Sequence, residues 1–369
     1  MAVEHHVVDE ALARGDGEEP DVKDDAASED EDASTEIRYR ISSYGADYPV
    51  DGLVKRLQRG DIAVPRFQRE FVWPLPQASR FIESLLLGLP VPAIFLSRES
   101  DTQKLMVIDG QQRLKSLLFF YQGVLHGKEF KLHGVTEEFE GLTYRTLEDE
   151  DRRRLDDSIL HAIIIKQEDP GNDDSSVYMV FERLNTTSTA LSPQEIRACV
   201  YHGSFNDYLA KANENPDWRE IFGKPSARQK DRELLLRFFA LFYKLGSYKR
   251  PMKIFLNGFM NENRQLRRYD EATLNGVLEP TMALVNQTVG REAFRPQHAL
   301  NASVTDAILV GVARRLQHGP VTDRNALEVA LNPVLRDDRF ADLYTVGTTD
   351  PEKVRARIEK VTGAVQSVA

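Results

Sequence analysis

Thiols and long apolar runs are scarce in this sequence. Of its 369 residues only Cys199 is a cysteine, which excludes a disulfide framework and a zinc site built from several thiolates. The longest apolar stretch, residues 85–96, is too short to span a bilayer and is interrupted by Pro90 and Pro92. The N-terminus shows no basic region followed by an apolar run, the pattern of a secretory signal. We therefore expect a cytoplasmic protein that has no membrane partner.

The formal net charge of −10 is concentrated at the N-terminus. Residues 1–36 contain 14 acidic and 2 basic side chains and no aromatic residue, whereas the other 333 residues contain 46 basic and 44 acidic side chains. Such a segment buries too little apolar surface to offset the entropy lost on ordering, so we expect residues 1–36 to form a disordered acidic tail. The tail either keeps the chain in solution or imitates nucleic acid in a basic groove.

Hydrophobic periodicity divides the remaining chain into strands and helices. Residues 39–44 are interpreted as a segment that leads into the fold. Strands are expected at residues 93–96, 105–108, 130–132 and 160–165. Helices are expected at residues 50–58, 77–87, 147–157, 231–245, 274–289, 304–316, 325–335 and 351–365. The polar, turn-rich stretch 168–174 marks a boundary, which predicts an α+β chain with an α/β domain at 37–170 and an all-helical domain at 175–369.

The stretch at residues 105–121 joins one of these strands to a helix. The turn pair Asp109–Gly110 follows the apolar run, and apolar residues then recur at helical spacing: Leu114, Leu117, Leu118 and Tyr121. Backbone N–H groups at a helix start lack intrahelical partners and carry the positive end of the dipole, which suits a phosphate. The sequence therefore predicts a helix that packs on the sheet and presents its first turn to an anion.

The polar residues at this junction each offer a contact to a nucleotide. Gly110 lets a ligand approach the backbone, and Gln111 and Gln112 can hydrogen-bond a base, sugar or phosphate. Arg113 offers a planar fork for phosphate oxygens, and Asp109 can hold a divalent cation through water or accept from a ribose hydroxyl. The alternative is a tight turn in which Asp109 is the N-cap and the polar side chains face solvent.

A second polar segment lies between Pro65 and Pro74. Arginine and glutamine residues alternate there with aromatic rings, which suits nucleotide recognition by stacking and phosphate pairing; the side chains are Arg66, Phe67, Gln68, Arg69, Phe71 and Trp73. A loop whose aromatic rings fill the core explains the same pattern equally well.

Four blocks of the sequence together resemble the N-terminal domain of GmrSD-type restriction systems. They lie at residues 64–73, 82–92, 108–113 and 180–197, and they occur in the family's order. The resemblance covers roughly residues 40–200, and it implies a ParB/sulfiredoxin-like α/β core in which residues 109–113 form the nucleotide site. Gly110 and Arg113 also match the Gly-x-x-Arg phosphate-binding pattern of that wider superfamily. The family links this site to binding and hydrolysis of a nucleoside triphosphate, coupled to restriction of modified foreign DNA.

The histidines depart from what full-length members of that family carry. Such members have a C-terminal HNH nuclease domain or act beside a partner that has one, and an HNH site needs a histidine base next to acidic metal ligands. The eight histidines are scattered: His5, His6, His126, His133, His161, His202, His298 and His318. We therefore expect a chain that is not itself a nuclease and that works with a separate nuclease subunit.

The fourth block contains a polar loop followed by a new helix. Ser192 as N-cap, Pro193 at the first helical position and Glu195 at the third form a capping box. Asn185 lies in the loop before it, between Arg183 and the helix. The loop is either held by capping bonds alone or, as the resemblance favours, faces the nucleotide.

A basic cluster in the helical part is the candidate DNA contact. Lys249, Arg250 and Lys253 occur beside Tyr248 and Phe255, a mixture that can follow a phosphate backbone. A solvated helix face is the alternative, because acidic residues nearly balance the charge of the folded part.

Taken together, the sequence predicts a Mg²⁺-dependent nucleoside triphosphate-binding sensor of a restriction or phage-defence system. Asp109, Gln111, Gln112 and Arg113 are the candidate catalytic residues, with Asp109 also the candidate Mg²⁺ ligand. The nucleotide contacts are expected from Gln68, Arg69, Gly110, Arg113 and Asn185. No residue stands out as a general base, so hydrolysis is expected only through Mg²⁺ and positioned water. The alternative is a DNA- or partner-binding module that retains the fold without hydrolysis.

Overall fold

The computed structural model describes residues 21–23, 40–64, 71–98, 103–169, 175–184 and 191–369. The chain divides into two compact units. The α/β unit comprises Asp30–Leu209 and Arg250–Glu271, and the helical unit comprises Met1–Glu29, Ala210–Lys249 and Ala272–Ala369. Helices from the predicted helical domain thus join the α/β unit, so the units cross the boundary that was predicted at residues 168–174.

The α/β unit contains a five-stranded sheet with the strand order β2-β8-β4-β5-β3. Strands β8 and β4 are parallel, as are β5 and β3, whereas β2 with β8 and β4 with β5 are antiparallel. The strands are β2 (Arg40–Pro49), β3 (Ile62–Ala63), β4 (Ile94–Arg98), β5 (Leu105–Asp109) and β8 (Ile159–Asp169). A small hairpin is formed by β6 (Val124–Leu125) and β7 (Lys128–Glu129).

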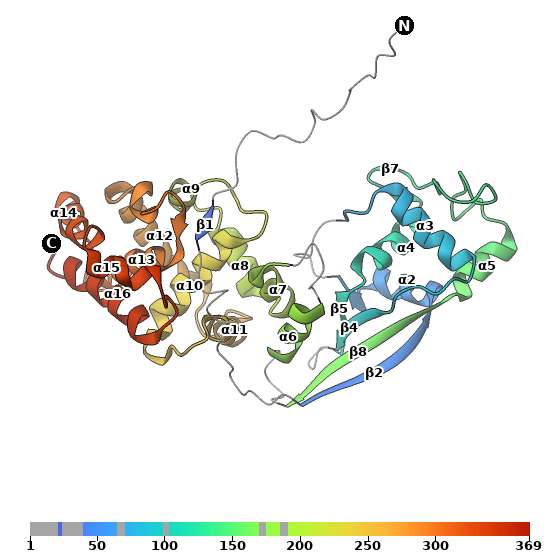
Figure 1. Ribbon diagram of the computed structural model, residues 1–369, viewed down its shortest axis with the longest axis horizontal. Coiled ribbons are helices and arrows are strands. Elements are labelled where there is room, and N and C mark those ends of the chain that lie inside the picture. The colour runs from blue at the N-terminus through green and yellow to red at the C-terminus, as the bar shows by residue number, and fades with distance from the viewer. Residues whose placement is uncertain (1–20, 24–39, 65–70, 99–102, 170–174, 185–190) are drawn as a thin grey trace, which may run out of the picture. The chain divides into compact units, whose positions relative to one another are not determined.

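Helices α2, α3 and α4 lie together on one face of this sheet (Figure 1). Their bounds are α2 (Val50–Arg59), α3 (Leu75–Leu86) and α4 (Gln111–Gln122), and α5 (Asp149–Asp157) packs beside α2 and α3. The predicted apolar face of α4 is confirmed at Leu114 and Leu117, which are fully buried, although Phe120 replaces Tyr121 as the innermost aromatic ring. The core of the unit therefore lies between these helices and the sheet.

Two predictions at the strand level were wrong. Residues 39–44 do not merely lead into the fold, because ten residues from Arg40 to Pro49 form β2 and pair along β8. Residues 130–132 form no strand; Phe130 and Leu132 are buried outside any ladder. The apolar pattern reports burial correctly at Phe130 and Leu132, whereas Ile41 and Tyr44 of β2 are exposed; neither pattern specifies the backbone partner.

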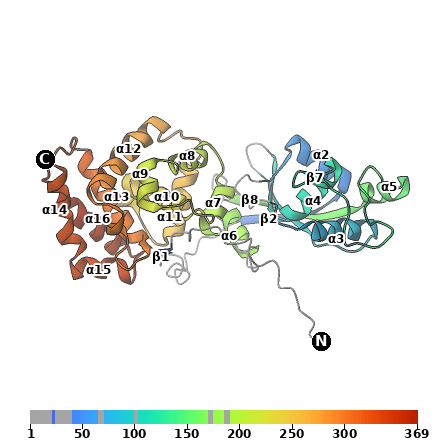
Figure 2. The same cartoon turned by 90° about the horizontal axis from the view of Figure 1, so that it is seen from above.

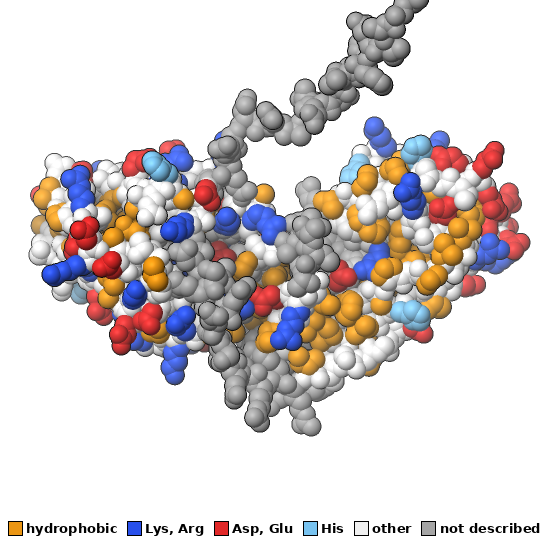
Figure 3. Space-filling model, viewed as in Figure 1, with side chains coloured by type: hydrophobic (Ala, Val, Ile, Leu, Met, Phe, Trp, Pro, Cys, Tyr) orange, Lys and Arg blue, Asp and Glu red, His pale blue; other side chains and the backbone are white. Residues whose placement is uncertain are grey.

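The opposite face of the sheet is partly open. Figure 3 shows hydrophobic side chains gathered there over β4 and β8. Phe95 of β4 and Ile163 of β8 are register partners, and both are half-buried. Acidic side chains gather elsewhere, over α5. Part of this face packs against α6 (Ser175–Leu184). The same unit also contains α7 (Pro193–Val200), α11 (Met252–Asn263) and the start of α8 (Ser204–Ala212), which runs into the helical unit.

The predicted capping box at the start of α7 is confirmed. The Ser192 hydroxyl accepts a hydrogen bond from the Glu195 backbone N–H at 3.2 Å, and the Glu195 carboxylate accepts from the Ser192 N–H at 2.6 Å. Pro193 occupies the first helical position, where its missing N–H costs nothing.

The helical unit is organised around α13 (Ala302–Leu316), which is buried along nearly its whole length and packs against α10 and α16 (Figure 2). Its other elements are α9 (Pro216–Phe222), α10 (Lys230–Lys244), η2 (Leu245–Ser247), α12 (Glu271–Thr288), η3 (Arg291–Phe294), α14 (Arg324–Leu335), α15 (Asp338–Thr345) and α16 (Pro351–Val365). The predicted long helices of this region are confirmed to within a few residues. The shorter ones, α8, α9, α11 and α15, were not predicted.

Three buried charges lie at the centre of the helical unit. Arg237 of α10 donates two hydrogen bonds to Asp306 of α13, at 3.1 and 2.6 Å, and Arg357 of α16 donates a third at 3.3 Å. Each of these side chains is at most 1% exposed. One carboxylate thus joins three helices.

A short piece of the predicted acidic tail belongs to this unit. Val22 and Lys23 form β1, which pairs in parallel with β9 (Leu300–Asn301), and Val22 is buried. Residues 1–20 and 24–36 lie outside the described part of the chain. Within the described part, no helix combines the length and the apolar character that crossing a membrane requires.

Candidate functional site

The predicted junction between β5 and α4 is built around Gly110. This residue is buried and adopts a left-handed backbone conformation with φ of 96°, which turns the chain directly from the strand into the helix. A Cβ at this position would collide with Cγ2 of Ile94 and lie 3.0 Å from its Cβ. The glycine is therefore required by packing against β4, whereas the sequence suggested that it admits a ligand.

Arg113, one turn into α4, binds three acceptors of the protein itself. Its Nη1 donates to the backbone carbonyls of Pro92 (2.5 Å) and Ala93 (3.0 Å), and its Nη2 donates to the Asp109 carboxylate at 2.9 Å. The side chain is only 12% exposed, and burial lowers the pKa of Arg113 from its ordinary value, against the opposing influence of Asp109. Arg113 thus ties the segment before β4 to the end of β5.

Asp109 remains half-exposed at the mouth of this junction, with 49% of its side chain accessible. It is not the N-cap of α4, because Gly110 occupies that position and no side chain caps it. The alternative interpretation of Asp109 as N-cap was therefore wrong. Instead, the Arg113 guanidinium fixes one carboxylate oxygen and leaves the acid facing outward.

Gln112 brings the two predicted motifs together. Its side-chain Oε1 accepts hydrogen bonds from the backbone N–H groups of Val72 (3.0 Å) and Trp73 (3.3 Å). Phe71 packs edge-to-face on Phe119 of α4, with ring centroids 5.2 Å apart. Residues 71–73, the end of the predicted aromatic segment, are thus held against α4.

Three of the expected nucleotide contacts, Gln68, Arg69 and Asn185, lie outside the described residues. Gln111, the first residue of α4, is half-buried beside the junction. Of the predicted site, the structure therefore places Asp109, Gly110, Gln111, Gln112 and Arg113.

The predicted basic cluster is partly neutralised. Lys253 forms an ion pair with Glu182 of α6, at 3.1 Å to both carboxylate oxygens, whereas Lys249 and Arg250 are exposed. Lys249 ends a segment of the helical unit, and Arg250 and Lys253 belong to the α/β unit. One cation of the candidate DNA surface is thus already engaged by an acid.

No group of three or more His, Cys, Asp or Glu side chains that could hold a metal ion occurs among the described residues. Mg²⁺ is commonly held by one or two carboxylates together with water and substrate phosphates, so a single half-exposed Asp109 is compatible with such a role. The donor set at the junction fits Mg²⁺ that arrives with a nucleotide and offers little to a free ion.

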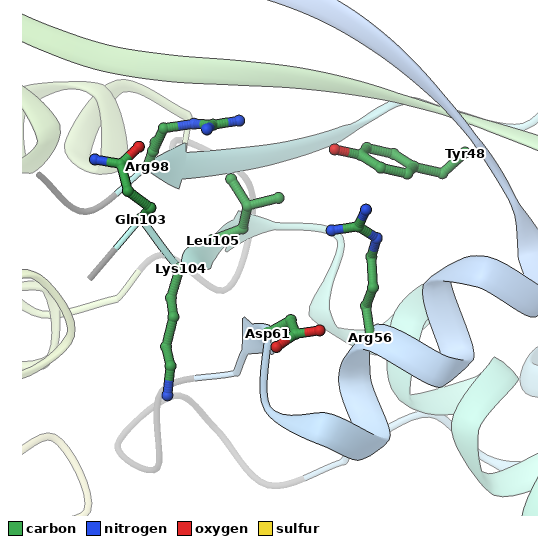
Figure 4. Close-up of a pocket in the computed structure, with 7 residues that line it drawn as sticks. All are labelled: Tyr48, Arg56, Asp61, Arg98, Gln103, Lys104 and Leu105. Atoms are coloured by element: carbon green, nitrogen blue, oxygen red, sulfur yellow. The ribbon is translucent and has the colours of Figure 1, made fainter.

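The structure also contains a cavity that the sequence did not indicate (Figure 4). It is lined by Tyr48, Arg56, Asp61, Arg98, Gln103, Lys104 and Leu105. They come from two stretches of the chain, residues 48–61 and 98–105, and no sequence pattern indicates that these two stretches meet.

An α/β sheet whose strand passes through a buried glycine into a helix defines this part of the chain as a candidate ligand-binding domain. Residues 50–202 match the model of the family described as GmrSD restriction endonuclease, N-terminal domain. All four sequence blocks lie within the matched residues, so the match confirms the resemblance that they indicated.

An uncharacterised protein of Methanocaldococcus jannaschii is similar to part of the chain. The two are 27% identical over 110 residues, which cover 24% of this chain and 18% of the relative. This similarity adds no functional assignment.

Proposed function

We propose that the α/β unit binds a nucleoside triphosphate with Mg²⁺ where β5 meets α4. The bound nucleotide regulates restriction of DNA, and a separate nuclease subunit does the cutting. The observation that carries the proposal is the half-exposed Asp109 beside the first turn of α4. An acid that can receive Mg²⁺ thereby lies next to backbone N–H groups that suit phosphate oxygens.

The side chains of the junction have different roles in the proposed site. Gln111 lies at the helix start and contacts the nucleotide. Arg113 is a positioning residue, because its guanidinium donates to Asp109 and to two backbone carbonyls. Gln112 holds the neighbouring segment through Val72 and Trp73. Hydrolysis, where it occurs, uses Mg²⁺ and positioned water.

Calorimetry of the full chain with each of the four common nucleoside triphosphates, with and without Mg²⁺, tests binding. We expect Gln111→Ala to weaken binding by about tenfold, the value of one hydrogen bond to a charged group. Asp109→Asn is expected to remove the dependence on Mg²⁺. Gln122→Ala, the same substitution at the exposed far end of α4, is the matched control and should bind as the wild type does.

Arg113→Ala is a poor probe of binding, since it also removes three internal hydrogen bonds. Equal affinities for wild type, Gln111→Ala and Asp109→Asn would show that the nucleotide does not bind at this junction. A phosphate-release assay on the same proteins separates hydrolysis from binding.

The alternative, a non-hydrolysing DNA- or partner-binding module, makes a different prediction. Such a protein would release no phosphate and would shift DNA in a gel without nucleotide. Loss of that shift on replacing Lys249 and Arg250 by alanine would assign DNA binding to the basic cluster.

A further inference from the structure

A cavity of about 450 Å³ lies against the sheet in the α/β unit, with Arg56 and Arg98 on its walls. This volume falls within the range of sites for small organic ligands, about 300–1,000 Å³. Arg56 comes from α2, Tyr48 from β2, Arg98 from β4 and Leu105 from β5, so the cavity lies where the β2–α2 segment meets the β4–β5 pair. Arg98 and Leu105 are register partners in the antiparallel β4–β5 pair, which fixes that wall.

The two arginines are held in place by aromatic rings. The Arg56 guanidinium lies 5.5 Å from the centre of the Tyr48 ring, and the Arg98 guanidinium lies 5.9 Å from the centre of the Tyr44 ring. Figure 4 shows both guanidinium groups turned toward the space beside the Tyr48 hydroxyl, whereas the Lys104 side chain extends the other way. A cation–π contact at this distance leaves the N–H groups of the guanidinium available for an anion.

Neither arginine has a carboxylate partner within the described part of the chain. Asp61, the acid that lines the cavity, forms an ion pair with Arg59 at 3.3 Å. The Arg98 Nε is buried and makes no hydrogen bond to any described residue. A buried donor of a charged group that lacks a protein partner points to water or to an anion that completes the site.

We infer that this cavity binds a small phosphorylated molecule that carries at least two negative charges. Its phosphate oxygens accept from the N–H edges of Arg56 and Arg98 and from the Tyr48 hydroxyl, and Asp61 accepts from a hydroxyl of the organic part. The fork of a guanidinium matches phosphate geometry, and two such forks in one cavity suit a ligand with at least two negative charges.

This site differs from the junction that is proposed to hold the nucleoside triphosphate. Leu105 begins β5 and Asp109 ends it, so the two places lie roughly 13 Å apart along the strand. Variants can therefore address the two sites separately.

Calorimetry of the full chain with pyrophosphate tests the inference. We expect Arg56→Gln and Arg98→Gln each to weaken binding by about tenfold or more, because each removes a charge-assisted contact. Lys55→Gln is the matched control: it makes the same charge change one residue earlier on α2, where Lys55 is exposed and pairs with Asp51 at 2.7 Å. The control should bind as the wild type does.

Arg98→Lys keeps the charge without the fork and provides a second variant at the more buried position. It should also bind more weakly, and unfolding midpoints of all variants verify that they are folded. Succinate, a dicarboxylate of similar charge, should bind more weakly than pyrophosphate.

Several outcomes would overturn the inference. They are no binding of pyrophosphate to the wild type, an equal loss in Lys55→Gln, wild-type affinity in both arginine variants, or succinate binding as tightly as pyrophosphate. If Gln111→Ala alone weakens pyrophosphate binding, the anion lies at the β5–α4 junction, and the proposed function stands while this inference fails.

Discussion

The arginines of the two units differ in what they contact. In the helical unit, Arg237 and Arg357 are buried and share the Asp306 carboxylate. In the α/β unit, Arg56 and Arg98 lie over tyrosine rings at a cavity and have no carboxylate partner among the described residues. A buried arginine with a buried acid is part of the core, whereas an arginine at a cavity without an acid remains available to a ligand.

Arg113 lies between these extremes. It is nearly buried and engaged by three acceptors, but one of them, Asp109, is half-exposed. Charge and residue type alone therefore do not distinguish a binding arginine from a structural one. The partners of the guanidinium distinguish them, because an anion can bind only N–H groups that it can reach and that no protein acceptor already occupies.

The largest expected effect is at Asp306. Replacing it by alanine leaves Arg237 and Arg357 buried without their carboxylate, which we expect to cost about 3–5 kcal/mol of unfolding free energy. Urea denaturation measures this loss. Glu328→Ala on the exposed face of α14 is the control and should change stability by less than about 0.5 kcal/mol. A similar small change at Asp306 would contradict the structural role of the three charges.

The second largest effect is expected at Gly110, which sets the geometry that lets Arg113 reach Asp109. Gly110→Ala combines a positive-φ penalty with a collision against Ile94, for a loss of roughly 2–4 kcal/mol. Gly123→Ala, at φ 77° with open space around it, carries only the backbone penalty and should lose about 1–2 kcal/mol. If both glycines respond equally, packing against Ile94 is not what demands Gly110.

Arg113→Ala tests the intermediate case. Two backbone carbonyls and the Asp109 carboxylate lose a donor, and we expect a loss of about 1–3 kcal/mol in urea denaturation. Asp109→Ala should lose less, because that carboxylate is half-exposed and the carbonyl contacts of Arg113 remain. Equal losses in the two variants would place the main stabilisation in the ion pair and not in the carbonyl contacts.

The α/β unit also contains an acid with neutral partners, and this contrast with Asp306 is visible in pH dependence. Tyr121 and Tyr144 both donate to Asp156, at 2.5 and 2.9 Å. Burial, followed by the hydrogen bond to Asp156, raises the pKa of Tyr121 and raises the pKa of Tyr144 to about 12 from its ordinary 10.0.

Since the folded state holds these protons more tightly than the unfolded state, their contribution to stability is complete below pH 10.0 and is lost as the pH rises toward about 12. The urea midpoint should fall less steeply with rising pH in the double variant Tyr121→Phe/Tyr144→Phe than in the wild type. If the midpoint of the double variant falls with pH as steeply as that of the wild type, other groups cause the loss of stability at alkaline pH.

The smallest effect on stability is expected at the cavity. Arg56→Gln removes an exposed guanidinium whose described contact is the Tyr48 ring, so unfolding free energy should change by less than about 1 kcal/mol. If Arg56→Gln lowered the unfolding free energy as much as Asp306→Ala, Arg56 would be a structural residue, and the arginines of the two units would not differ in role.

Local pattern predicted much of the fold. The helix at α4 follows from the spacing of Leu114 and Leu117, and the start of α7 follows from Ser192 and Glu195, because both depend on contacts within one or two turns. The sequence also predicted that Asp109–Arg113 joins a strand to a helix. It missed β2, whose pairing with β8 joins residues more than one hundred positions apart.

The sequence by itself thus determined the spans of the long helices, the capping box of α7 and the position of the strand-to-helix turn, since periodicity and capping act between near neighbours. Only the tertiary structure decided that Ile94 leaves no room for a side chain at position 110 and that Arg113 donates to Pro92 and Ala93. It also decided that Arg56 and Arg98 line one cavity. These relations depend on strand order and register, which bring together side chains that no local spacing relates.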